Sequence, residues 1–149
     1  MPRFALIVLF LFLRYQITTA QTGYHDFDAT KYSKIDLVSN ASGFKTKVYY
    51  KNDTICKIAR EFAGSSFSST TIWYIKDGKL THGIFVSLRD KKKYFEEHTY
   101  FLNNKMIRWI NSVDKELDPA LKVFGDKEKL ALKFFEDDLN EVRSKKALR

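Results

Sequence analysis

The residues of this chain whose side chains could perform catalysis or bind a metal are three histidines, one cysteine and two adjacent pairs of acids. Histidines and carboxylates can transfer protons or hold a metal ion, and a cysteine thiolate can act as a nucleophile. In chain order these residues are His25, Cys56, His82, Glu96, Glu97, His98, Asp137 and Asp138. The histidines have no metal-ligand spacing, and adjacent carboxyl groups diverge on a strand or a helix, so the acids are expected to be ordinary solvated charges. No metal site is predicted.

The familiar nucleophile and cofactor motifs are also missing from the sequence. It contains no P-loop, no dinucleotide-binding glycine pattern, no Gly-x-Ser-x-Gly turn and no His-Glu-x-x-His helix. Cys56 is the only cysteine, which excludes a disulfide framework and a multi-cysteine zinc site, and it is expected to behave as a small hydrophobic residue. We therefore expect no enzyme activity and no cofactor. A hydrolase that uses His82 or His98 stays open as an alternative.

Composition and the N-terminus indicate a folded, exported protein. Of the 149 residues, 44% are hydrophobic and 15% aromatic, too many for a disordered chain. The apolar run 4–13 ends at Arg14, and Thr18 and Ala20 stand at the small-residue positions before a cleavage site, as in a secretory signal peptide. The run is too short to cross a bilayer. We expect residues 1–20 to be removed, a single domain over 21–149 with no membrane anchor, and a periplasmic or extracellular location.

Positive charge is concentrated in the middle of the chain. The formal net charge is +8, and residues 44–111 carry 13 Lys or Arg against 6 Asp or Glu. In an exported protein this charge favours anionic glycans, lipids or membrane surfaces over nucleic acid, although a role in solubility explains it equally well.

Three segments of the middle region share one pattern at intervals of 25 and 26 residues. Each places two Asn, Asp or Gly residues between an aromatic stretch and a second apolar stretch, and the segments are 49–55, 74–80 and 100–106. These residue types tolerate the positive φ angles of a two-residue type I′ turn, so three consecutive β-hairpins are expected. The predicted strands are 45–51, 54–62, 70–76, 79–88, 97–102 and 105–111, with linkers at 63–69 and 89–97. Together they form an antiparallel β-meander of about six strands over 45–111.

Two-residue turns also predict which residues face each other across each hairpin. On one face, apolar pairs close to the turns are expected to be core: Tyr50 with Ile55, Ile75 with Leu80, and Phe101 with Met106. On the other face the pairs are Tyr49 with Cys56, Tyr74 with Thr81, and Tyr100 with Ile107. The same register places His82 opposite Trp73 and His98 opposite Trp109, on opposite faces, so the two histidines are not expected to share a site.

Aromatic rings interleaved with lysines are suited to stacking on sugar rings and to pairing with anionic groups. The predicted ligand-binding residues are therefore Tyr49, Lys51, Tyr74, Lys76 and Tyr100, with Trp73 and Trp109 as further candidates. The alternative is that the tyrosines only fill a half-buried sheet surface, for which tyrosine is well suited.

The two ends of the mature chain are expected to be helical. In the tail, 118–147, Asp118-Pro119 predicts a short turn and Asp126 is expected to cap an amphipathic helix that packs on the apolar face of the sheet. Its apolar residues are Leu132, Phe135, Leu139 and Val142, with Leu130 and Phe134 beside them. In the N-terminal segment, 21–44, residues 24–39 are expected to contain a short helix capped by Asp28. Its inward-facing residues would be Tyr32, Ile35 and Val38.

The order of these features resembles a known group of proteins. A signal peptide, "YYKNDTICKI", "WYIKDGKLTHGIF", "TYFLNNKMIRWI" and a charged final helix are similar to small exported proteins of Bacteroidetes-type bacteria that repeat Tyr-Tyr-Phe-x-Asn-Gly-Lys-Leu hairpins. The resemblance covers residues 45–145, although only the second hairpin keeps the Gly. It implies a bacterial envelope setting and an antiparallel sheet, and it supplies no activity and no functional residues.

Taken together, the sequence favours a non-enzymatic exported binding or structural module of the bacterial envelope, with an anionic glycan or lipid as its ligand. An alternative is a protein-binding inhibitor or accessory subunit that presents its sheet to another exported protein.

Overall fold

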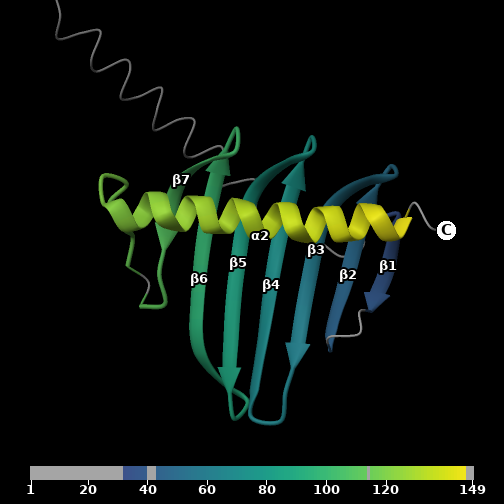
Figure 1. Cartoon of the computed structure of the whole chain (residues 1–149), viewed down its shortest axis with the longest axis horizontal. Coiled ribbons are helices and arrows are strands. Elements are labelled where there is room, and N and C mark those ends of the chain that lie inside the picture. The colour runs from purple at the N-terminus through teal and green to yellow at the C-terminus, as the bar shows by residue number, and fades with distance from the viewer. Residues whose placement is uncertain (1–31, 40–42, 114, 147–149) are drawn as a thin grey trace, which may run out of the picture. The chain divides into compact units, whose positions relative to one another are not determined.

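Seven antiparallel strands in sequential order form one sheet, and a long helix crosses one of its faces (Figure 1). The computed structural model describes residues 32–39, 43–113 and 115–146; the predicted signal peptide and residues 21–31 lie outside these ranges. The elements are β1 (Lys34–Ser39), β2 (Phe44–Lys51), β3 (Thr54–Ala63), β4 (Phe67–Lys76), β5 (Lys79–Arg89), β6 (Lys92–Leu102), β7 (Lys105–Ile110) and α2 (Lys122–Lys146). The predicted α+β meander with a C-terminal helix is confirmed, with one strand more than expected.

Two-residue turns with positive φ at both positions close four hairpins. Three are the predicted ones, at Asn52-Asp53, Asp77-Gly78 and Asn103-Asn104, with φ between 50° and 74°. The fourth is Asp90-Lys91, with φ of 51° and 64°. The prediction of a charged linker at 89–97 is therefore wrong, because Asp90 tolerates the left-handed conformation and most of that segment continues as β6.

The predicted register is correct next to each turn and wrong beyond it. Tyr50 pairs with Ile55, Ile75 with Leu80 and Phe101 with Met106, as expected. One extra residue then bulges out of each returning strand: Cys56, Thr81 and Ile107. Tyr49, Tyr74 and Tyr100 consequently pair with Lys57, His82 and Arg108 instead of with the bulged residues.

The two terminal segments also differ from the predictions. Residues 34–39, expected to be helical, form β1 and pair with β2, because β2 offers a full strand edge to them. Helix α2 begins at Lys122 rather than at Asp126 and runs through Gly125. Asp118 accepts a hydrogen bond from the backbone N–H of Ala120 (2.8 Å) and forms the expected turn before the helix.

The core lies between α2 and the half of the sheet nearest the three predicted turns. The expected apolar row is buried there, and Val48, Ile58 and Trp73 form the next row. From the helix, Phe124, Ala131, Phe135, Leu139 and Val142 pack on these rows. Strands β3 to β6 extend well beyond the region that α2 crosses (Figure 1), so the helix covers only part of this face.

Candidate functional site

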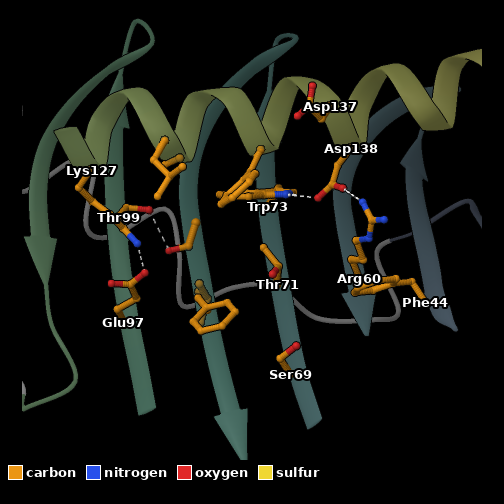
Figure 2. A pocket seen from close by; sticks show the side chains of 16 residues that line it. Phe44, Arg60, Ser69, Thr71, Trp73, Glu97, Thr99, Lys127, Asp137 and Asp138 are labelled. Carbon is orange, nitrogen blue, oxygen red and sulfur yellow. Dashed lines mark hydrogen bonds and ion pairs between the residues drawn. The ribbon is translucent and has the colours of Figure 1, made fainter. Parts of the chain in front are cut away.

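A cavity of about 570 Å³ opens where α2 ends its cover of the sheet (Figure 2). Its floor is the row of cross-strand neighbours Arg60, Thr71, Phe85 and Glu97, together with Ser69 on the next row. Its roof is formed by Lys127, Leu130, Ala131, Phe134, Asp137 and Asp138 of the helix. This volume is in the range of small-molecule sites, roughly 300–1,000 Å³.

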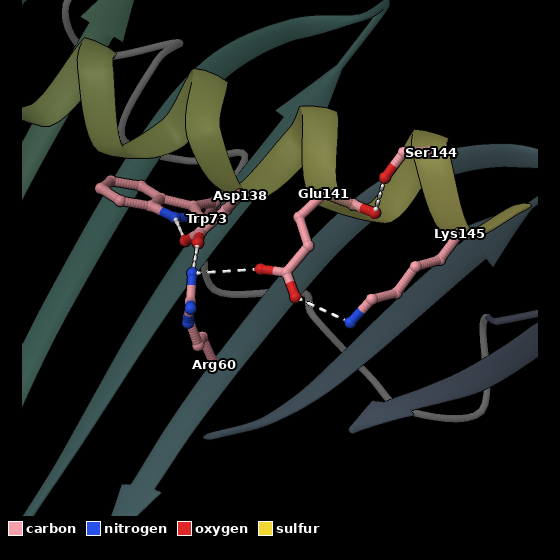
Figure 3. A network of polar contacts seen from close by, with 6 residues as sticks. All are labelled: Arg60, Trp73, Asp138, Glu141, Ser144 and Lys145. Carbon is pink, nitrogen blue, oxygen red and sulfur yellow. Dashed lines mark hydrogen bonds and ion pairs between the residues drawn. The ribbon is translucent and has the colours of Figure 1, made fainter. Parts of the chain in front are cut away.

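At one end of the cavity, a buried carboxylate of the helix joins a tryptophan and an arginine of the sheet. The indole Nε1 of Trp73 donates a hydrogen bond of 2.7 Å to one oxygen of Asp138, and Arg60 pairs with the other. Arg60 also lies 3.4 Å from Glu141, which in turn pairs with Lys145 at 2.8 Å (Figure 3). Both Asp138 oxygens are thus occupied, and we call Asp138, Trp73 and Arg60 the Asp138 cluster.

The opposite end repeats the arrangement with the charges exchanged between helix and sheet. Glu97 of β6 accepts a hydrogen bond of 3.1 Å from the indole Nε1 of Trp109 at one oxygen and pairs with Lys127 of α2 at the other. These three residues form the Glu97 cluster. The expectation that Glu97 and Asp138 are solvated is wrong, since each is only 6% exposed. The sequence neighbours Glu96 and Asp137 point elsewhere, and sequence alone does not distinguish the members of each pair.

Gly83 makes the first of these clusters possible. It lies opposite Trp73 in the sheet, and a Cβ at this position would come within 2.6 Å of the indole ring and 2.7 Å of the Thr99 hydroxyl. The indole therefore lies across the glycine, where it packs edge-on against Phe135 at a ring-centre distance of 6.1 Å. This packing directs its N–H to Asp138.

The remaining lining of the cavity is apolar with a few hydroxyl groups. Phe85, Leu130, Ala131 and Phe134 contribute apolar surface, and the large side chains of Leu130 and Phe134 are 46% and 52% exposed. Ser69 and Thr71 lie on the cavity side of β4 (Figure 2). A site of this composition suits a small, mostly apolar molecule.

The predicted tyrosines do come together, on the sheet face away from the cavity. Cross-strand pairing produces a continuous line, which we call the tyrosine row: Tyr49, Lys57, Tyr74, His82, Tyr100 and Arg108. The Lys57 ammonium lies 4.7 Å from the Tyr49 ring centre and 5.4 Å from that of Tyr74. His82 stacks between Tyr74 and Tyr100 at 5.4 and 4.4 Å.

The other predicted ligand residues lie elsewhere. Lys51 and Lys76 are exposed at the strand ends beside the turns, where they pair with Thr54 and Lys79, so Lys57 and Arg108 supply the cations of the row. Trp109 packs at the edge of the core, whereas Trp73 lines the cavity. Ligand binding by the tyrosine row stays a prediction.

His82 and His98 share one face, contrary to the prediction, because the bulges shift the register. His82 pairs with Tyr74 and His98 with Ile110, and the two imidazoles are linked by a 3.2 Å hydrogen bond. His98 is also 3.1 Å from Glu96. Burial of His82, and secondarily the neighbouring His98, lowers the pKa of His82 to about 3, so its ring is neutral at pH 7.

Cys56 is the bulged residue of the first hairpin. Its thiol donates to the carbonyl of Tyr49 at 3.3 Å, as the Thr81 hydroxyl does to the carbonyl of Tyr74 at 3.0 Å in the second hairpin. Burial raises the pKa of the Cys56 thiol, which opposes formation of a thiolate.

Comparison with known proteins gives no match: no protein-family model fits the chain, and no curated protein or solved structure is significantly similar to it. Within the described ranges, no helix has the length and apolar character to span a membrane. In the same part of the chain, no three His, Cys, Asp or Glu side chains are grouped as metal ligands.

Proposed function

We propose that this protein is a non-enzymatic binding module that holds a small, mostly apolar molecule in the cavity between α2 and the sheet. The observation that carries the proposal is the cavity itself, whose apolar walls lie between two ion-paired clusters. Phe134 and Leu130 leave large apolar surfaces exposed at this site, and a ligand would remove them from water.

We further propose that the protein acts outside the cytoplasm, in the envelope of a bacterium. The leader-like residues 1–20 and the resemblance of 45–145 to exported hairpin proteins support this. Sequencing the N-terminus of the protein recovered outside the cytoplasm tests it: a chain that begins at Gln21 is expected, and one that still begins at Met1 would contradict export.

Titration with N-phenyl-1-naphthylamine, an uncharged apolar dye that fluoresces in apolar surroundings, tests the cavity. Wild-type protein should bind it saturably, and Phe134→Asp should weaken binding at least about tenfold, because a carboxylate would enter the apolar wall. Val123→Asp is the matched control, since Val123 is 49% exposed on the same helix and does not line the cavity.

Circular dichroism should show that both variants keep the fold. Absence of saturable dye binding by the wild-type protein would contradict the proposed site, and so would an equal loss of dye affinity in the two variants.

A further inference from the structure

We infer that the ligand of this cavity is an uncharged amphipathic molecule of the monoacylglycerol type, with an apolar chain and a hydroxyl-bearing head group. This inference rests on the proposed function and adds the chemical class of the ligand. It follows from which polar groups of the cavity are already paired and which are not.

The charged groups buried in the cavity lining are neutralised within the protein. Each oxygen of Asp138 and Glu97 already accepts from an indole N–H or a cation. Arg60 faces two carboxylates through its Nη1, Asp138 and Glu141, while its Nε is buried and has no hydrogen-bond partner among the described residues. Lys127 pairs with Glu97. An anionic head group would have to compete with these carboxylates for their cations, and that competition leaves a buried charge unpaired.

A cationic head group has no better partner. The one further carboxylate of the lining is Asp137, which is exposed to water. An ion pair formed there is worth at most about 1 kcal/mol. The lining therefore offers little stabilisation to a ligand head group of either charge.

Two hydroxyl groups of the lining remain available to a ligand. The side chains of Ser69 and Thr71 lie two residues apart on the cavity side of β4, about 7 Å from each other along the strand. Neither hydroxyl makes a hydrogen bond to another residue of the described ranges. Hydroxyls both donate and accept, so they match the oxygens of a glycerol head group.

The position of these hydroxyls also orients the ligand. Ser69 and Thr71 lie along β4 on the side of Trp73 away from α2, whereas Leu130, Ala131 and Phe134 belong to the helix (Figure 2). An amphipathic molecule can thus place its chain beneath the helix and its head over β4.

Displacement of N-phenyl-1-naphthylamine by three molecules with the same twelve-carbon chain tests the inference on the full chain. We expect 1-dodecanoylglycerol to displace the dye at a concentration at least about tenfold lower than dodecanoate or dodecylamine does, all below their aggregation concentrations. If either charged molecule competes as well as the glyceride, the inference is wrong while the proposed cavity stands. If the dye itself does not bind, the proposed function fails first.

A pair of double variants locates the head group. Ser69→Ala with Thr71→Val should weaken 1-dodecanoylglycerol at least about fivefold and leave the dye affinity unchanged. Ser68→Ala with Thr70→Val makes the same chemical change on the opposite face of β4, outside the cavity. This control should change neither the glyceride affinity nor the dye affinity. Equal glyceride binding by the two double variants would overturn the assignment of Ser69 and Thr71.

Discussion

At position 82, an imidazole lies between two phenol rings and beside a second imidazole, with only 5% of the residue exposed. Burial, and then His98, lowers the pKa of His82 from 6.5 to about 3. The folded protein therefore binds fewer protons at this position than the unfolded chain does. The resulting stabilisation is fully present above about pH 6.5 and is lost as the pH falls toward about 3.

His82→Phe keeps a stacking ring and removes the titration. The free energy of unfolding of the wild type, relative to this variant, should decrease by about 2 kcal/mol between pH 7 and pH 5. Urea unfolding of both proteins at each pH measures it. A difference that does not change with pH would show that His82 titrates normally in the folded protein.

At the scale of the elements, the hairpins and the fit between sheet and helix depend on single small residues. Gly83→Ala would drive a methyl group into the Trp73 ring and should lower the free energy of unfolding by about 2 kcal/mol. Gly125→Ala is the contrasting variant, because nothing lies within 4 Å of its Cβ position in α2. It should raise stability by up to about 1 kcal/mol.

Chemical unfolding measures both changes. The tryptophan emission of Gly83→Ala should also shift, because the indole would leave Asp138. If Gly83→Ala left the free energy of unfolding unchanged, Trp73 would be able to move without loss of stability.

The sequence predicts these elements better than it predicts their alignment. Asn, Asp and Gly pairs predict the turns because few other residues adopt positive φ, and helical spacing predicts α2. The bulges at Cys56, Thr81 and Ile107 leave no comparable signal, because three different residue types occupy the bulged position. One extra residue changes every later pairing, so the histidine contact could not be predicted.

The cavity could not be predicted from the sequence for a related reason. Its residues come from five strands and the helix, and the row through Arg60, Thr71 and Glu97 exists only once the register is known. The sequence does not distinguish a buried acid such as Asp138 from an exposed neighbouring acid such as Asp137. A buried Trp next to an isolated Gly across a hairpin, as at Trp73 and Gly83, is the one pattern that could have indicated close packing there.

At the scale of the whole described unit, α2 is held on the sheet by an apolar stripe and by two clusters of reversed polarity. Asp138→Ala would leave the Arg60 charge and the Trp73 N–H without their acceptor and should cost about 3 kcal/mol of stability. Asp137→Ala, at the exposed neighbouring position, should change stability by no more than about 0.5 kcal/mol. Thermal and urea unfolding compare them, and equal effects would show that the Asp138 cluster does not hold the helix.

The lengths of the helix and the sheet limit how such a protein can grow. A helix of 25 residues is about 38 Å long, and seven adjacent strands span about 29 Å, so α2 crosses the sheet from β7 to β1 with about 9 Å of length to spare (Figure 1). Duplication of one more hairpin unit would widen the sheet by about 10 Å. One such unit would take up the length by which α2 now exceeds the sheet, and a second unit would require about two further helical turns, so repeat number and tail length are coupled.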